Sequence, residues 1–196
     1  MSVEVYPVIH IESAEQAVDQ AGLVFDIGVN GVFLIDHSGL ADDLLTPVFQ
    51  KVKGEFPDKF VGVNYLEFTS FEAMSHLKEA KNRDQITSLP DGLWVDNAIA
   101  DRRQTVELRR WSRNLKKIEY LGGVAFKYTY AYTENPEFAA FQAIALSPFV
   151  DVVTTTGPGT GEPPQPNKIR AMKEAIGKKP LAIASGIDAS NLVDYL

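Results

Sequence analysis

The sequence predicts an α/β fold of alternating strands and helices, and the (β/α)8 TIM barrel is the architecture that fits it best. Seven short apolar runs recur along the 196 residues, beginning near Val3, Gly31, Phe60, Gly92, Gly122, Val150 and Pro180. These starts lie 28 to 32 residues apart, a spacing that fits one strand and one helix with their loops. Nearly continuous apolar strands separated by helices indicate a parallel sheet covered by helices. The even spacing favours a closed barrel over an open doubly wound sheet.

The elements follow from local patterns. Predicted strands cover residues 3–11, 31–37, 60–67, 92–97, 122–129, 150–156 and 180–186. Apolar residues with helical spacing lie between them, for example over residues 14–21 and 169–176. Ser13-x-x-Gln16 and Thr69-x-x-Glu72 have the form of capping boxes, which mark helix starts.

The number of units is one short of a full barrel. A (β/α)8 barrel has eight strands and about 250 residues, with a lower bound near 200. Residues 188–196 read as the start or the whole of a seventh helix. We therefore expect one barrel domain over residues 1–196 that is incomplete at its carboxyl end, with strand eight beginning just beyond Leu196. Otherwise the first and seventh strands keep open edges that another chain must cover, so a homo-oligomer is compatible with the sequence.

Composition excludes several classes of protein. Hydrophobic residues make up 45% and charged residues 23%, as in folded globular proteins. A net charge of −7 disfavours nucleic-acid binding, and the absence of cysteine excludes disulfides and Zn–Cys sites. No amino-terminal signal and no apolar run of about 20 residues is present, so we expect a cytoplasmic protein with no membrane span.

Polar residues end the predicted strands, where a barrel carries its chemistry. They are His10, Asp36, His37, Asn64, Glu67, Asp96, Asn97 and Lys127. Lys127 stands in an apolar run and suits a base or Schiff-base nucleophile; the alternative is a buried ion pair with Asp96 or Glu67. His10 suits a general base or a structural histidine. Asp36, His37, Glu67 and Asp96 also suit a divalent metal, but solvated loop charges are the simpler interpretation, and we predict no metal site.

Two glycine-rich loops predict an anion site. Residues 154–161, Thr-Thr-Thr-Gly-Pro-Gly-Thr-Gly, follow the sixth strand, and Ser185-Gly186 follows the seventh. Glycines allow the backbone to approach a ligand closely, and barrels commonly bind phosphate at the loops after their last strands. The alternative is a tight surface loop without a ligand.

The chain resembles the BtpA family. The resemblance rests on Val8-Ile9-His10, Gly62-Val63-Asn64, residues 153–161 with Pro163, and Ser185-Gly186-Ile187 with Asn191. It implies a TIM barrel similar to phosphate-binding barrels, an association with photosystem I biogenesis, and an eighth strand beyond the seventh helix. The family-like positions are His10, Asn64, Lys127, Thr160, Gly161, Ser185 and Gly186. Asp36-His37 and Lys127-Tyr128 depart from the family pattern, which leaves the substrate open.

The combined expectation is an enzyme acting on a phosphorylated small metabolite, a sugar phosphate or a nucleotide-like compound. The reaction is proton transfer, carbon–carbon cleavage or glycosyl transfer, and no cofactor is identified. Predicted catalytic residues are Lys127, His10 and Asp96. Predicted substrate-binding residues are Thr156, Gly157, Thr160, Gly161, Ser185, Gly186, Asn64, Asp36 and Glu67. A non-catalytic assembly scaffold and a phosphoribosyl-type transferase are the alternatives.

Overall fold

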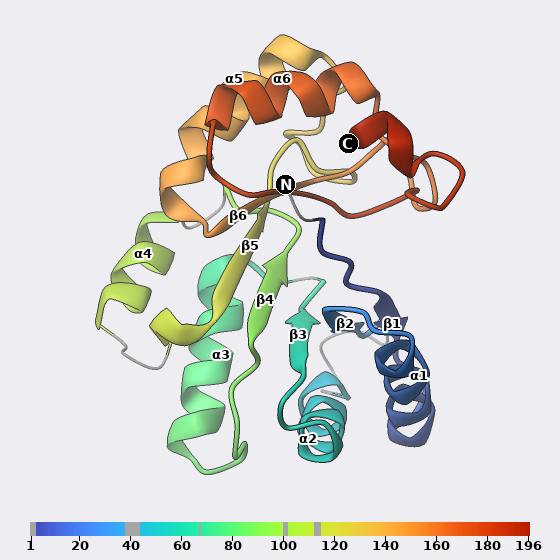
Figure 1. Cartoon of the computed structure of the whole chain (residues 1–196). Helices are drawn as coiled ribbons and strands as arrows, with labels where there is room; N and C mark the ends of the chain where they lie inside the picture. The colour runs from blue at the N-terminus through green and yellow to red at the C-terminus, as the bar shows by residue number, and fades with distance from the viewer. Residues whose placement is uncertain (1–2, 38–43, 67, 100–101, 112–114) are drawn as a thin grey trace. The chain divides into compact units, whose positions relative to one another are not determined.

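A computed structural model describes residues 3–37, 44–66, 68–99, 102–111 and 115–196 (Figure 1). Within these residues seven strands alternate with helices, as the repeat predicts. The strands are β1 (Val8–His10), β2 (Gly31–Ile35), β3 (Phe60–Asn64), β4 (Gly92–Val95), β5 (Glu119–Gly123), β6 (Val152–Thr155) and β7 (Leu181–Ile183). The α-helices are α1 (Ala14–Asp26), α2 (Leu45–Glu55), α3 (Ser70–Asn82), α4 (Arg102–Trp111), α5 (Pro136–Leu146) and α6 (Pro166–Ile176). Short 3-10 turns are η1 (Leu115–Lys117), η2 (Ser147–Phe149) and η3 (Leu192–Tyr195).

The chain falls into two compact units. The first comprises Met1–Trp94 and Glu107–Glu119, and its strands pair in parallel in the order β1-β2-β3-β4. His10 pairs with Ile35 and Ile35 with Asn64, so these three strands end at the same level. Every residue of β2 is buried, as expected for a strand covered on both faces.

The second unit comprises Val95–Val106 and Tyr120–Leu196, and its strands pair in parallel in the order β5-β6-β7. Gly123 pairs with Thr154 and Thr155 with Ile183. Helices α5 and α6 lie side by side in this unit (Figure 1). The loops that follow β5, β6 and β7 therefore all start at the carboxyl ends of these parallel strands.

At the amino ends of the strands, both units use the same device. In each case the residue just before a strand has a side-chain oxygen that accepts a hydrogen bond. The donor is a backbone N–H in the preceding strand of the sequence or in the segment that leads into it. Asn30 Oδ1 accepts from Val5 N at 2.9 Å. Asp91 Oδ2 accepts from Val61 N at 2.8 Å, and Asp151 Oδ2 from Tyr120 N at 2.8 Å. We call these three oxygens the amino-end acceptors.

The helix starts confirm one predicted capping box and correct the other. Thr69 Oγ1 accepts from Glu72 N at 3.3 Å while Thr69 N donates to Glu72 Oε2 at 2.8 Å. Ser13 caps α1 through Gln16 N, but the Gln16 side chain bonds the backbone of Glu12 and His10 instead. The reciprocal half of that predicted box is therefore wrong, because Gln16 is used to tie α1 to the end of β1.

Most predicted strands are longer than the observed ones, and three elements differ most from the prediction. The first strand begins at Val8 and not at Val3, and the segment predicted as a seventh helix holds one 3-10 turn. The fifth strand is Glu119–Gly123 and not residues 122–129. Glycine is required at Gly123, the last residue of this strand, because a Cβ there would collide with the backbone oxygen of Asp96. No helix in the described ranges is both long enough and apolar enough to cross a membrane.

Candidate functional site

Lys127 lies in the loop after β5, not in the strand where the sequence placed it. Positive φ angles at Ala125 (48°) and Tyr128 (60°) turn the chain away from the sheet. The Lys127 ammonium donates to Thr160 Oγ1 at 3.1 Å and to Ser185 Oγ at 3.4 Å, in the loops after β6 and β7. In the described part of the chain no carboxylate lies within ion-pair distance of Lys127. The predicted alternative of an ion pair with Asp96 is therefore wrong, and Glu67 lies outside the described residues.

Ser185 joins the loops after β6 and β7. Its hydroxyl donates to the Gly159 carbonyl at 3.0 Å and accepts from Gly161 N at 3.1 Å. Gly186 has φ +67°, and a Cβ there would meet the backbone of Glu162 and Pro163. Glycine is thus required at this position for both its conformation and its close approach. We call Lys127, Thr160 and Ser185 the hydroxyl–lysine cluster.

Thr156 and Gly157 determine the conformation of the loop after β6. Thr156 is fully buried, and its hydroxyl accepts from Lys127 N at 2.8 Å. A Cβ on Gly157 would meet the backbone of Glu162 and Pro163. Both residues therefore shape the loop that carries Thr160, and that hydroxyl of Thr156 is engaged by the protein itself.

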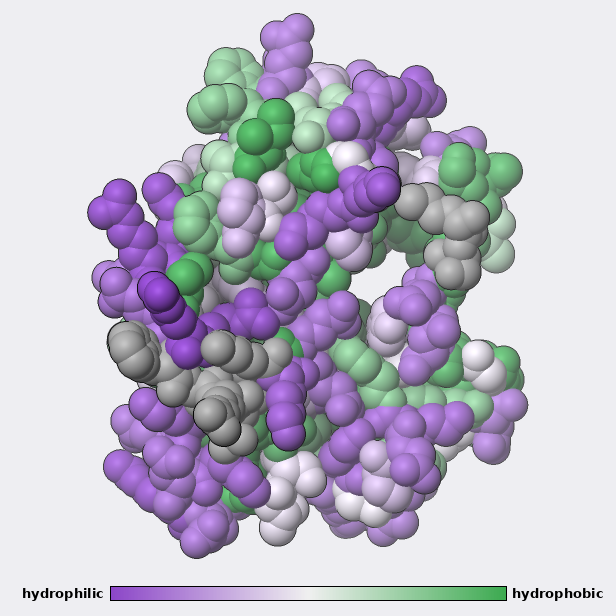
Figure 2. Space-filling view, turned by 60° about the vertical axis from the view of Figure 1, so that its left-hand side comes forward, coloured by the Kyte–Doolittle hydropathy of each residue, from purple (hydrophilic) through white to green (hydrophobic). Residues whose placement is uncertain are grey.

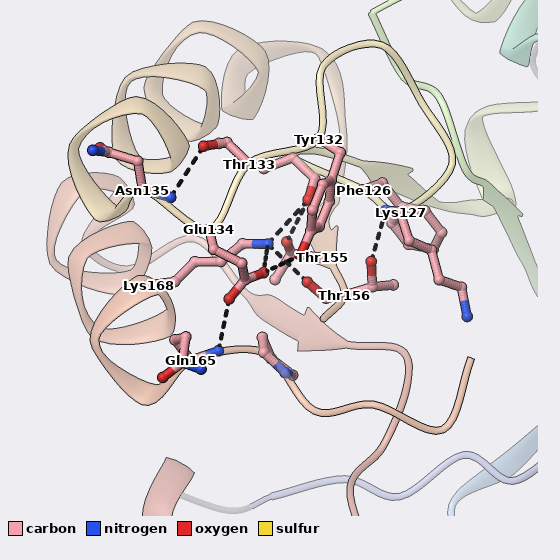
Figure 3. Close-up of polar contacts among 12 residues, drawn as sticks. Phe126, Lys127, Tyr132, Thr133, Glu134, Asn135, Thr155, Thr156, Gln165 and Lys168 are labelled. Atoms are coloured by element: carbon pink, nitrogen blue, oxygen red, sulfur yellow. Dashed lines mark hydrogen bonds and ion pairs between the residues drawn. The ribbon is translucent and has the colours of Figure 1, made fainter. Parts of the chain in front are cut away.

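A buried lysine that the sequence analysis missed lies beneath this loop (Figure 3). Lys168, on α6, has no exposed surface, and its ammonium donates to Thr156 O at 2.7 Å and Ala125 O at 3.1 Å. It also pairs with Glu134 Oε1 at 2.9 Å. Burial lowers the pKa of the Lys168 ammonium, and Glu134 opposes that shift. Figure 3 shows the Lys127 side chain pointing away from this group.

Glu134 completes the buried group. Its Oε1 accepts from the Tyr132 hydroxyl at 2.8 Å, and its Oε2 accepts from Gln165 N at 2.9 Å (Figure 3). Burial and then the Glu134 carboxylate raise the pKa of the Tyr132 phenol. The Lys168 ammonium lies 4.9 Å from the centre of the Tyr132 ring. The loop after β5 is thereby fixed to the start of α6, which leaves little freedom to the backbone that presents Lys127.

In the first unit two histidines meet at the carboxyl ends of the strands. His10 Nδ1 lies 2.7 Å from His37 Nε2, with ring centres 4.9 Å apart and planes 11° apart. The ring planes are nearly parallel, and the ring centres are much farther apart than the two nitrogens. The two rings therefore lie side by side in nearly one plane, joined by a hydrogen bond between their edges. One nitrogen of the pair must be protonated and the other not.

The remaining predicted residues do not join either group. Asn64 ends β3 and is fully buried, and Asp36 follows β2 and is half-buried. Asp96 follows β4, where its backbone packs against Gly123, and no bond joins it to Lys127. Within the described residues, no three His, Cys, Asp or Glu side chains gather as they would around a metal ion.

The comparisons with known proteins identify a fold and no family. No model of a known protein family matches the chain, and no curated protein matches it. A mandelate racemase/muconate lactonizing enzyme from Roseiflexus sp. superimposes with a TM-score of 0.62 at 16% identity, over 95% of this chain and 49% of that one. Dihydropteroate synthase from Thermus thermophilus superimposes with a TM-score of 0.56 at 20% identity, over 92% of this chain and 71% of that one.

Both neighbours are TIM-barrel enzymes, so the chain has an α/β fold of the TIM-barrel type. It spans about half the length of the first neighbour. The BtpA resemblance, the single-domain assignment and the eighth strand stay predictions.

Proposed function

We propose that this chain belongs to a TIM-barrel enzyme acting on a phosphorylated small metabolite, whose phosphate binds at the hydroxyl–lysine cluster. The observation that carries the proposal is the Lys127 ammonium, held between Thr160 and Ser185 with no described carboxylate within ion-pair distance. A cation that is positioned by neutral hydroxyls keeps its full attraction for an anion.

The surrounding loops add donors suited to a phosphate. The Thr160 hydroxyl, which accepts from the Lys127 ammonium, can turn its hydrogen toward an acceptor. The backbone N–H groups of Gly186 and Ile187 bond to no acceptor in the part of the chain that the structure describes. These donors come from the loops after β6 and β7, where barrels commonly bind phosphate.

The chemical roles follow from this arrangement. Lys127 serves as the electrostatic group that binds the phosphate. Thr156, Gly157 and Gly161 give the phosphate loop its shape. Asp96 belongs to the same unit as Lys127 and is the proposed partner in proton exchange. The roles expected from the sequence for His10, Asn64, Asp36 and Glu67 stay predictions.

Thermal-shift measurements with ribose 5-phosphate, inorganic phosphate and ribose test the proposal. A ligand at about 100 times its Kd adds about 2.7 kcal/mol of stability, which raises the Tm of a chain this size by roughly 5–10 °C. We expect the two phosphate compounds to raise the Tm and ribose to leave it unchanged. Lys127→Met should weaken phosphate binding at least about tenfold, because a charged hydrogen bond contributes about 1.5–3 kcal/mol.

Lys178→Met is the matched control, since Lys178 is exposed just after α6 and has no described partner. It removes the same charge away from the cluster and should leave phosphate affinity unchanged. Equal losses in both variants would mean that the attraction is only the general charge of the surface. No shift with any phosphate compound would contradict the proposal.

A non-catalytic assembly scaffold is the second candidate, and α5 favours it. Phe138, Phe141 and Ile144 are 65%, 69% and 54% exposed at three-residue spacing on this helix. Figure 2 shows hydrophobic side chains gathered over the upper part of the view, where α5 lies. Exposed apolar patches on a folded protein often mark interaction sites. A scaffold predicts the same Tm with and without phosphate compounds.

A further inference from the structure

Tyr128 is an exposed aromatic residue at the edge of the hydroxyl–lysine cluster. Its side chain is 77% exposed although its ring is large and apolar. We propose, building on the proposed phosphate site, that the phosphorylated ligand carries a planar aromatic ring near its phosphate and that this ring stacks on Tyr128.

Hydrogen bonds place the Tyr128 ring beside the phosphate donors. The Tyr128 hydroxyl accepts from Thr160 N at 3.2 Å and lies 3.4 Å from Thr160 Oγ1. Thr160 Oγ1 is also the acceptor for the Lys127 ammonium. The phenol and the ammonium therefore converge on one side chain, and they come from adjacent residues in the loop after β5.

The ammonium and the ring are close enough to hold two parts of one small molecule. Lys127 Nζ lies 5.6 Å from the centre of the Tyr128 ring. A phosphate oxygen bonded to Lys127 lies about 2.8 Å from Nζ, and stacked rings have centres about 4.5–7 Å apart. A ring joined to the phosphate directly or through a few atoms can reach the Tyr128 ring without leaving the cluster.

The backbone at Tyr128 is held in a conformation that a bulky residue rarely adopts. Its φ is +60°, in the left-handed region where glycine or asparagine is usual. Such residues persist where the surrounding structure fixes them, and they concentrate at binding sites. The Thr160 hydrogen bonds fix the far end of the side chain, so the exposed ring is oriented and not free to rotate away.

The hydroxyl–lysine cluster also changes the pKa of the Tyr128 hydroxyl. Hydrogen bonds from the Thr160 hydroxyl and backbone, together with the Lys127 charge, hold the pKa of the Tyr128 phenol below its usual value. The phenol oxygen is thus already engaged by the protein. The part of Tyr128 left for a ligand is the face of its ring.

Calorimetric titration with four compounds tests the inference: inorganic phosphate, ribose 5-phosphate, phenyl phosphate and AMP. Ring stacking is typically strong enough to change Kd about fivefold or more. We expect phenyl phosphate, AMP or both to bind at least about fivefold more tightly than ribose 5-phosphate. Preference for AMP alone identifies a nucleotide, and preference for phenyl phosphate alone identifies a shorter aryl phosphate.

Three variants separate the ring from the loop. Tyr128→Asn removes the ring but suits the left-handed backbone, so it should abolish the preference for aromatic compounds over ribose 5-phosphate. Tyr128→Phe loses the bonds to Thr160 but keeps the ring, so it should bind aromatic phosphates more tightly than ribose 5-phosphate, unlike Tyr128→Asn. Tyr130→Asn is the matched control, because Tyr130 is 80% exposed two residues away and bonds to no described residue.

The outcomes distinguish the two proposals. Binding of none of the four compounds contradicts the phosphate site itself. Binding of all four with similar Kd leaves the phosphate site standing and overturns the stacking role. An aromatic preference that survives Tyr128→Asn, or that is lost equally in Tyr130→Asn, also overturns it.

Discussion

The two compact units resemble each other at the amino ends of their strands and differ at the carboxyl ends. At the amino ends, Asp91 in the first unit and Asp151 in the second accept the same kind of backbone N–H bond. At the carboxyl ends, the first unit has His10 and His37 bonded to each other. The second has an ammonium held by hydroxyls of other loops.

This difference separates the side chains that stabilise the fold from the side chains that can bind a ligand. The amino-end acceptors satisfy backbone groups, which any parallel strand pair requires. The carboxyl-end groups satisfy no such general need, and barrels place their chemistry at that end. The comparison predicts that substitutions at the two ends affect different properties.

The largest expected loss of stability is at Lys168, whose buried ammonium binds the loops after β5 and β6 in the second unit. Lys168→Met leaves the Glu134 carboxylate without its ion-pair partner and removes a hydrogen-bond donor from the carbonyls of Ala125 and Thr156. Removing one partner of a buried pair costs about 3–5 kcal/mol, so we expect a Tm lower by roughly 6–20 °C. Differential scanning calorimetry measures it.

Arg170→Met is the control for this change, because Arg170 is exposed on the same helix and has no described partner. It should change stability by no more than about 0.5 kcal/mol. Similar Tm values for the two variants would mean that the Lys168 group does not stabilise the second unit.

A smaller effect is expected at the amino ends, where the two units should respond alike. Asp151→Ala and Asp91→Ala each leave a backbone N–H without its acceptor, at about 1–2 kcal/mol. Asp91→Ala also removes the ion pair of Asp91 with Lys53, at 2.8 Å. Urea unfolding gives the free energies, with Asp19→Ala on the exposed face of α1 as the control. A loss in one unit only would break the equivalence of the two amino ends.

The smallest effect is expected at the helix caps, one in each unit. Thr69 caps α3 and Asn135 caps α5, where Asn135 Oδ1 accepts from Glu137 N at 3.0 Å. Thr69→Ala and Asn135→Ala should each cost about 1 kcal/mol in urea unfolding. Unequal losses would show that one helix start is held by more than its cap.

The Thr69 cap also predicts a pH dependence. The Thr69 backbone N–H, followed by the Thr69 hydroxyl, holds the pKa of the Glu72 carboxyl below 4.5. Because the folded pKa is lowered, the stabilisation is present above the unfolded pKa and is lost as the pH falls through the folded pKa. Wild type should therefore exceed Glu72→Gln in stability at pH 7, and the gap should narrow as the pH falls below the unfolded carboxyl pKa of about 4.3.

The sequence predicted the fold better than the position of individual side chains. The period near 30 residues located all seven strands, because each βα unit repeats one burial pattern. The predicted position of the fifth strand along the sequence was wrong. Val124 and Phe126 are buried, as residues of a strand would be, but they follow Gly123, the last residue of the strand. Burial alone does not distinguish a strand from a packed loop.

The site was predicted in part. Lys127, Thr160 and Ser185 were recognised because they follow strands, and the structure places them together. Lys168 was missed although it lies next to Ile169 and four residues before Met172, which puts it on the buried face of α6. A lysine on an apolar helix face is a signal for a buried partner. The contact of Tyr128 with Thr160 had no such signal, because it depends on a left-handed backbone angle.

The amino-end acceptors have a consequence for how loops can change. Asn30, Asp91 and Asp151 bond the strand pairs β1/β2, β3/β4 and β5/β6 at the amino ends of the strands. A slip of one residue would turn every buried side chain of a strand to the opposite face, and these bonds oppose it. Changes in the loops after the strands should therefore leave the register of the core intact. Loop residues that are themselves packed, such as Gly186 against Glu162 and Pro163, stay constrained by the fold.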